Sequence, residues 1–388
     1  MLGKPALKRT LPWLAALALR AFAQPLDVFD HSPESYLGAD SCAACHSEQF
    51  ARQAASGHAL SLHPTAGHPA SASFVPSRPL VRSGGLRYSY RAGEGGLRVE
   101  VTAQGQRIDS RLEWAFGAGE QAVTFVGQVD EGRYVEHHFS YYSASGGLGT
   151  TPGHRDVPAR GAREALGVYY ETFGPQPSIM RCFQCHSTGP LALGDGFSLR
   201  PRELGVRCEA CHGPGRQHVE AVESGALEQA TAAIRNPARL PGDRLLEFCG
   251  ACHRPPASAG QVIDWSDPWN VRHQPVYLSR SACTQPGGQP LACMRCHDPH
   301  GPLSAEAARD IRRCTECHEN GLPPASVCRP AAGRTCSSCH MPPVRPQDEL
   351  RFTNHWIGVY DPENPLRPRE AVPRRAASGD RARSIERP

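Results

Sequence analysis

The pentapeptide CxxCH occurs seven times in this 388-residue chain, and no other feature restricts its possible folds as strongly. Two thiols separated by two residues can each add to a vinyl group of haem, and the next histidine then reaches the iron. A zinc site needs paired CxxC motifs with four ligands per metal ion, and it gives no reason for a histidine after every pair. The motifs therefore predict seven covalently bound haems c.

The motifs supply fourteen of the sixteen cysteines and seven predicted proximal iron ligands. The thioether cysteines are Cys42 and Cys45, Cys182 and Cys185, Cys208 and Cys211, Cys249 and Cys252, Cys293 and Cys296, Cys314 and Cys317, and Cys336 and Cys339. The proximal histidines are His46, His186, His212, His253, His297, His318 and His340. One motif lies near the N-terminus and six lie in the C-terminal half, with uneven spacing. This pattern does not fit a solenoid of equal repeats.

The N-terminal residues have the pattern of a secretory signal peptide. Lys4, Lys8 and Arg9 precede a short apolar run over residues 11–19, and the small-x-small sequence of residues 21–23 is a cleavage site. The apolar run is too short to span a bilayer. We therefore expect residues 1–23 to be removed and the product to be periplasmic, without a transmembrane anchor. Bacteria attach c-type haem in that compartment.

Removal of the signal peptide also removes the positive excess of the chain. Its four basic residues leave 38 of the 42 basic residues against 38 acidic ones. Each haem would add two propionates, so a holoprotein of this composition is acidic unless arginines neutralise them. The basic isoelectric point is thus no argument for nucleic-acid binding. The expected partners are redox proteins, whose identity the sequence leaves open together with the oligomeric state.

The composition favours a multihaem fold in which the porphyrins supply much of the core. Only 39% of the residues are hydrophobic, and the chain contains 38 glycines and 36 prolines. Such a chain is poor at building a conventional core of this size. We predict short α-helices and loops packed around haems, with helical segments at residues 40–56 and 216–230.

The long gap between the first two motifs contains a different pattern. Residues 86–90 and 97–101 alternate between apolar and polar side chains, as half-buried strands do. Residues 123–126 and 134–142 form a second candidate pair, with a turn at residues 130–132. The predicted division is therefore a signal peptide (1–23), an N-terminal single-haem segment (24–79), a small antiparallel β insertion (80–143), a six-haem domain (144–362) and a disordered tail (363–388).

The sixth ligand of each iron decides what the haems can do. Methionine raises the reduction potential, but the chain has four methionines and Met180 is the one loose candidate. Histidine is abundant outside the motifs, so ligation by two histidines is the default expectation. The distal candidates are His58, His154, His218, His273, His300 and His355. His300 is too close to His297 to reach the other face of the same iron, so we expect it to bind a neighbouring haem.

Four sequence blocks resemble the multihaem cytochromes of the cytochrome c-554/c-prime family, which have doubled CxxCH motifs. These blocks are CAACH with SGHA, GVRCEACHGPGRQHV at residues 205–219, SRSAC with LACMRCHDPHGPL, and CSSCHMP with FTNHWI. The resemblance covers most of residues 40–360. It implies an exported, electron-transferring protein and adds weight to His58, His218, His300 and His355 as distal ligands. The chain departs from this pattern at residues 120–121, where Glu-Gln replaces an expected histidine.

Two functions from different classes remain open at this point, and so does the question of whether the chain is an enzyme. The first is electron transfer through a chain of haems with two histidine ligands each. The second is a multihaem oxidoreductase acting on a small nitrogen or sulfur compound at a haem with an open axial site. The haem of His253 is the first place to look for an open iron, because its nearby distal candidate, His273, is the weakest. The haem of His46 is the second, because the predicted β insertion separates it from the other haems.

The two cysteines outside the motifs form a separate prediction. Cys283 and Cys328 are expected to form a disulfide, because the compartment is oxidising. The alternative is two separate buried thiols. The sequence does not show whether their Cα atoms come close enough for a bridge.

Overall fold

A computed structural model describes residues 32–75, 80–82, 85–154, 159, 161–174, 178–284, 291–303, 312–318 and 335–369. The predicted signal peptide, most of the predicted tail and Cys328 lie outside these residues. The predictions made for them, including the Cys283–Cys328 disulfide, therefore stay predictions.

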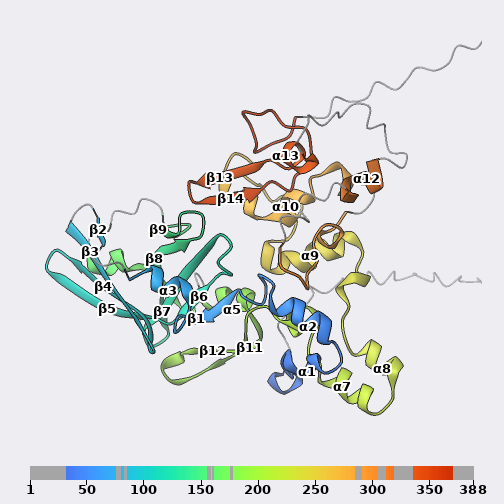
Figure 1. Cartoon of the computed structure of the whole chain (residues 1–388), viewed down its shortest axis with the longest axis horizontal. Coiled ribbons are helices and arrows are strands. Elements are labelled where there is room, and N and C mark those ends of the chain that lie inside the picture. The colour runs from blue at the N-terminus through green and yellow to red at the C-terminus, as the bar shows by residue number, and fades with distance from the viewer. Residues whose placement is uncertain are drawn as a thin grey trace, which may run out of the picture.

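Two antiparallel sheets form one side of the molecule, on the left of Figure 1. The larger sheet has the order β1-β6-β7-β8-β10, with β9 also paired to β8. Its strands are β1 (Leu62–Pro64), β6 (Trp114–Phe116), β7 (Ala122–Asp130), β8 (Arg133–Tyr142), β9 (Gly147–Thr150) and β10 (Gly167–Glu171). The second sheet contains, in order, β2 (Leu80–Arg82), β3 (Leu86–Gly93), β4 (Gly96–Ala103) and β5 (Gln106–Leu112).

All four predicted strand segments are strands, and the predicted turn joins β7 to β8. The β structure is nevertheless larger than the predicted small insertion. Strand β1 precedes residue 80, strands β9 and β10 follow residue 143, and all three join the larger sheet. The prediction of a fold made mostly of short helices therefore needs correction. Strands this short carry too few residues for apolar alternation to reveal them.

The apolar faces of the two sheets pack together with the short helices α3 (Pro69–Ser73) and α4 (Ala162–Leu166). Phe74, Tyr90 and Phe125 are buried in this core, and the Phe74 ring lies 4.5 Å from that of Phe125. Gly127 permits the closest approach of β7 to β5, because a Cβ at this position would lie 1.9 Å from the carbonyl oxygen of Arg111. The β region thus has a core of its own that needs no haem.

The motif-bearing half consists of short helices, as predicted. The α-helices are α1 (Asp40–Ala43), α2 (Ser47–Ala54), α5 (Met180–His186), α6 (Cys208–His212), α7 (Arg216–Glu223), α8 (Leu227–Ala232), α9 (Gly242–His253), α10 (Gln274–Leu278), α12 (Arg312–His318) and α13 (Cys336–His340). Two hairpins connect them, β11 (Ser187–Leu193) with β12 (Leu199–Leu204) and β13 (Pro343–Gln347) with β14 (Leu350–Thr353). The connections also contain short 3-10 helices, among them η5 (Pro268–Arg272) and η7 (Cys293–Arg295). The longest described helix, α9, has 12 residues.

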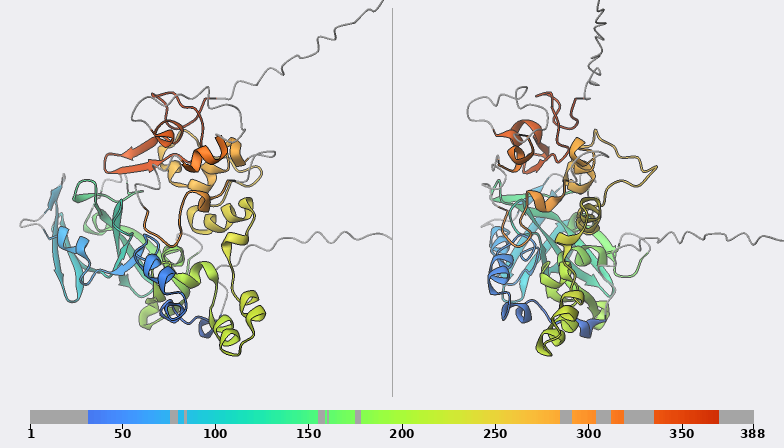
Figure 2. Two further views of the ribbon diagram at one scale, coloured as in Figure 1. Left: turned by 45° about the vertical axis from the view of Figure 1, so that its right-hand side comes forward. Right: turned by 90° about the vertical axis from the view of Figure 1, so that its right-hand side faces the viewer.

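Segments far apart in the sequence lie side by side in this half. Helices α1 and α2 lie near α7 and α8 in Figure 1, and Figure 2 shows the same neighbourhood from two other sides. Hairpin β13–β14 packs on η5 around Val271, Tyr277 and Val344. Histidines from one segment can therefore reach a motif in another.

Candidate haem sites

Four motif histidines face a histidine from outside the motifs. The pairs, with the distances between ring centroids, are His46–His218 (6.5 Å), His253–His58 (6.1 Å), His212–His300 (6.0 Å) and His297–His355 (6.2 Å). A metal–imidazole bond is about 2 Å long and the ring centre lies about 1 Å further on, so two imidazoles on one metal ion have centroids roughly 6 Å apart. These pairs therefore have the separation that a shared iron requires.

Each partner comes from a different part of the chain. His218 lies on α7, just after the third motif, yet it faces His46 of the first motif. His58 follows the first motif and faces His253 of the fourth. His300 follows the fifth motif and faces His212 of the third. The expectation that His300 serves a neighbouring haem agrees with this arrangement.

In five of the candidate ligands the backbone holds the other ring nitrogen. Nδ1 lies within hydrogen-bond distance of a carbonyl oxygen in His186 (Ser61, 3.0 Å), His212 (Arg235, 2.8 Å), His218 (Ala230, 2.9 Å), His340 (Gly358, 2.8 Å) and His355 (Thr353, 2.9 Å). Because a carbonyl oxygen only accepts hydrogen bonds, Nδ1 must be the donor. The lone pair then lies on Nε2, which is the arrangement that metal-binding histidines show. The residues present therefore fit a haem iron.

Burial favours the neutral form of four of the candidate ligands. It lowers the pKa of His58, His186 and His212 below the usual value, and it lowers the pKa of His355 to about 4. A neutral imidazole retains the lone pair that a metal needs.

Cysteines of different motifs also contact each other. Three pairs of thiols from different motifs lie within hydrogen-bonding range of each other: Cys42 and Cys208, Cys185 and Cys252, and Cys249 and Cys293. An ion pair of 2.6 Å between Arg295 and Glu316 links the fifth motif to the sixth. These contacts bring together motifs one and three, two and four, four and five, and five and six.

A buried carboxylate connects the first motif to the third. Glu209, inside the third motif, is 3% exposed. Its oxygens accept hydrogen bonds from the backbone N–H groups of Leu37 (3.0 Å), Gly38 (2.8 Å) and Gly215 (2.7 Å). The segment before α1 is thus held against α6.

His186 of the second motif has a different environment. Its ring packs edge-on against Phe116, with centroids 5.2 Å apart, and its Nδ1 is bonded to Ser61. Within the described part of the chain, no histidine ring is found facing it. His253 and His46, the first and second places to look for an open iron under the enzyme hypothesis, do face histidines. Their partners come from distant segments.

The remaining distal candidates, His154 and His273, face no motif histidine among the described residues. His154 places Nε2 3.0 Å from Oε2 of Glu136, and Nδ1 of His273 lies 3.3 Å from the Arg254 guanidinium. Glu136 and its second partner Tyr170 were missed by the sequence analysis. The alternation along residues 134–142 could have identified Glu136 as a polar residue on the same strand face as Tyr134.

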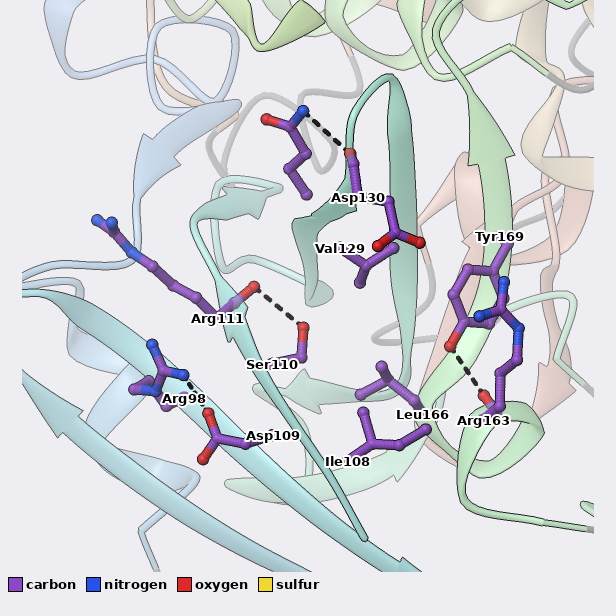
Figure 3. A pocket seen from close by; sticks show the side chains of 11 residues that line it. Arg98, Ile108, Asp109, Ser110, Arg111, Val129, Asp130, Arg163, Leu166 and Tyr169 are labelled. Carbon is purple, nitrogen blue, oxygen red and sulfur yellow. Dashed lines mark hydrogen bonds and ion pairs between the residues drawn. The ribbon is translucent and has the colours of Figure 1, made fainter. Parts of the chain in front are cut away.

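A pocket of about 370 Å³ lies between the two sheets of the β region. Arg98, Asp109, Arg111 and Arg163 are among its lining residues, as Figure 3 shows. No cysteine or histidine of a motif lines it. This pocket is therefore separate from the candidate haem sites.

Comparison with curated proteins finds distant relatives. The dissimilatory sulfite reductase MccA of Wolinella succinogenes is 24% identical over 232 residues, which is 47% of this chain and 30% of the relative. The cytochrome c nitrite reductase subunit NrfA of Nitratidesulfovibrio vulgaris is 22% identical over 194 residues, which is 44% of this chain and 35% of the relative. The multiheme cytochrome MtrA of Shewanella baltica is 21% identical over 176 residues, which is 41% of this chain and 51% of the relative. The chain thus spans at most about half the length of these relatives.

Among solved structures, the outer cell wall cytochrome OcwA has a similar fold. The TM-score is 0.50 at 16% sequence identity, over 83% of this chain and 79% of OcwA. No family model matches the chain. These similarities support the multihaem c-type cytochrome that the motifs predict, without distinguishing the c-554/c-prime family from others. None of the helices in the described ranges has the length and apolar character needed to cross a membrane.

Proposed function

We propose that the chain is an exported heptahaem c-type cytochrome that transfers electrons through covalently bound haems, most of them ligated by two histidines. The observation that carries this proposal is the set of four histidine pairs with centroids 6.0–6.5 Å apart. Each pair joins a motif histidine to a predicted distal ligand. Six-coordinate iron with two protein ligands suits electron transfer, since the coordination sphere need not change with oxidation state.

The contacts between motifs give the proposed haem order. The cysteine contacts connect motif one to motif three, motif four to motif five, and motif two to motif four. The Arg295–Glu316 ion pair connects motif five to motif six. Cys211 of the third motif also interacts with Cys249 and Cys252 of the fourth. Electrons would then pass along the haems of motifs one, three, four, five and six in that order. The haem of motif two would branch from that of motif four. This order differs from the sequence order.

Intact mass and redox spectroscopy test the proposal. The mature protein should exceed its chain mass by seven haems under denaturing conditions, and a smaller excess would contradict the haem count. Low-spin electron paramagnetic resonance (EPR) signals and mostly low potentials should be observed, because methionine ligation is the factor that raises potential. A matched control is Cys283→Ser, which removes a cysteine outside the motifs and should leave the haem count unchanged.

The cellular setting belongs to the same proposal. The signal-peptide pattern supports a periplasmic location, with protein electron donors and acceptors that are still to be identified. The division into an N-terminal haem segment, a β region and a six-haem domain also remains a proposal, as do the haems of His318 and His340.

A second candidate function is a reductase of a small nitrogen or sulfur compound at the haem of His186. The observation that favours it is that no histidine ring among the described residues faces His186. Two of the relatives have names that specify sulfite and nitrite reduction. A catalytic metal site generally keeps a position free for substrate. A high-spin EPR signal that shifts on addition of nitrite, hydroxylamine or cyanide would support this function, whereas low-spin signals that do not respond would contradict it.

A further inference from the structure

The segment 297–300, at the end of the fifth motif, connects two of the histidine pairs. His297 ends the motif, and its ring lies 6.2 Å from that of His355. His300 follows three residues later, and its ring lies 6.0 Å from that of His212 in the third motif. The backbone between the two histidines is therefore shared by the proposed haem sites of the fifth and third motifs.

A tight turn holds His300 in this position. The carbonyl oxygen of Asp298 accepts a hydrogen bond from the N–H group of Gly301 at 3.2 Å. Oδ1 of the Asp298 carboxylate accepts a second one from the N–H group of His300 at 2.9 Å. The sequence Asp-Pro-His-Gly suits such a turn, because aspartate is favoured at the first position, proline at the second and glycine at the fourth. The Asp298 side chain therefore fixes the backbone from which the His300 ring projects.

The middle of the same turn contacts a candidate ligand of another haem site. The ring of His58 forms a hydrogen bond with the backbone of Pro299. Because proline has no N–H group, its carbonyl oxygen must accept this bond from a ring nitrogen of His58. In the neutral ring the other nitrogen has the lone pair that a metal requires, and the ring lies 6.1 Å from that of His253 in the fourth motif. The segment 297–300 thus reaches the proposed haem sites of three motifs.

One ion pair fastens this turn to helix α2. The Arg52 guanidinium on α2 is bound to Oδ2 of Asp298, and α2 occupies the sequence between His46 of the first motif and His58. The two side chains are 54% and 42% exposed, and an ion pair with this exposure contributes little to overall stability. Its effect is therefore local, because it fixes the position of the turn relative to α2 and so relative to His58.

We propose that Arg52 and Asp298 are positioning residues for two distal ligands at once, His300 at the haem of the third motif and His58 at the haem of the fourth. Through this ion pair the turn couples the ligation of two haems that are neighbours in the proposed electron-transfer order. The inference rests on the proposed function, because it requires both histidines to bind iron. Neither Arg52 nor Asp298 is itself a proposed ligand.

Loss of the ion pair should affect both haem sites together. Arg52→Gln removes the guanidinium, whereas Asp298→Asn removes the carboxylate charge but keeps an oxygen that can accept the His300 N–H. In either variant the turn is no longer fastened to α2, so the rings of His300 and His58 change their positions. The ligation of a haem iron and the hydrogen bonds of its ligands set the EPR signal and the reduction potential.

The test is EPR spectroscopy and a potentiometric titration of the holoprotein. The signals of the two haems are assigned by their loss in His300→Ala and His58→Ala. In Arg52→Gln and in Asp298→Asn both signals should shift, and the potentials should move in the same direction in the two variants. A purely electrostatic effect would move them in opposite directions, because one variant removes a positive charge and the other a negative one. The double variant should shift the signals no further than either single variant.

Conservative and remote variants are the controls. Arg52→Lys keeps the positive charge and should retain the wild-type signals. Arg91→Gln breaks another exposed ion pair, with Asp109 at 2.7 Å in the β region, and should leave both signals unchanged. Asp298→Ala also removes the acceptor of the His300 N–H, so the low-spin signal of the third-motif haem should be partly lost and restored by free imidazole.

The two possible failures can be told apart. If Arg52→Gln and Asp298→Asn leave either haem signal at its wild-type position, or move the potentials in opposite directions, the inference is wrong and the proposed ligation stands. If His300→Ala and His58→Ala remove no low-spin signal, the proposed ligation itself fails, and the inference fails with it. The signals of the other haems report whether each variant is folded.

Discussion

The ring of His212 lies 6.0 Å from that of His300, with the two planes only 6° apart. His212 ends the third motif, and His300 follows the fifth. One haem at this position would hold two distant segments together through its iron. The backbone also fixes the ring of His212, because its Nδ1 donates to the carbonyl oxygen of Arg235.

Replacement of His300 by alanine should convert this haem from low to high spin. The alanine side chain has no nitrogen to occupy the sixth position, and His212 would remain as the one protein ligand. The visible absorption and EPR spectra measure the change. Free imidazole should restore the low-spin signal, and His63→Ala, on β1, should have no effect on it. A low-spin spectrum without imidazole would exclude His300 as the ligand.

The pair His58–His253 should give a different low-spin signal from the pair His212–His300. Its ring planes are inclined at 69°, against 6° for the other pair. Nearly perpendicular axial imidazoles make two iron d orbitals almost equal in energy, which produces one unusually large g value. That signal should disappear in His58→Ala, while the signal of the near-parallel pair stays. Persistence of the large-g signal would assign it to another haem.

Replacement of Glu209 by glutamine should destabilise the contact between the first and third motifs. The amide group cannot accept all three backbone hydrogen bonds, so at least one buried N–H loses its partner. We expect a loss of about 1.5–3 kcal/mol in the free energy of unfolding, as for buried bonds to a charged group. Urea unfolding measures it. Glu223→Gln, exposed at the end of α7, should change stability by less than about 0.5 kcal/mol.

Acidification should destabilise the β region through His137. This ring is fully buried, with Nδ1 donating to the carbonyl of Leu166 and Nε2 beside the Tyr90 hydroxyl, each at 2.8 Å. Burial lowers the pKa of His137 to about 3. The unfolded chain takes up a proton below about pH 6.5 and the folded chain does not, so this contribution to stability is complete above pH 6.5 and is lost as the pH falls towards 3.

The expected loss from His137 is about 1.4 kcal/mol per pH unit below pH 6.5. Urea unfolding at about pH 7 and pH 5, followed by circular dichroism, measures it. His137→Gln should be less stable than the wild type at pH 7, because its bonds to Leu166 and Tyr90 are altered, but its stability should change less with pH. An equal pH dependence in both proteins would show that other groups dominate.

Local patterns were sufficient for the prediction of the motif chemistry and of strands β3, β4, β7 and β8. The CxxCH motif specifies haem attachment within five residues, and apolar alternation is a property of neighbouring residues. The histidine pairs could not be derived in this way. The pairing of His58 with His253 depends on contacts between segments almost 200 residues apart, and His273 was considered for this haem only because it lies nearby in the sequence. Likewise, Glu136 and His154 meet only because β8 and the turn after β9 pack together.

The pairing of His46 with His218 has a consequence for maturation of the protein. If one iron binds both, it acts as a cross-link that closes a loop of more than 170 residues, and such closures restrict the unfolded chain as disulfides do. The first haem would acquire its second ligand only when the segment that carries His218 has also reached the compartment where haem is attached. Folding of the haem half would then wait for the third motif segment, whereas the β region, with its own apolar core, could fold before any iron has acquired both ligands.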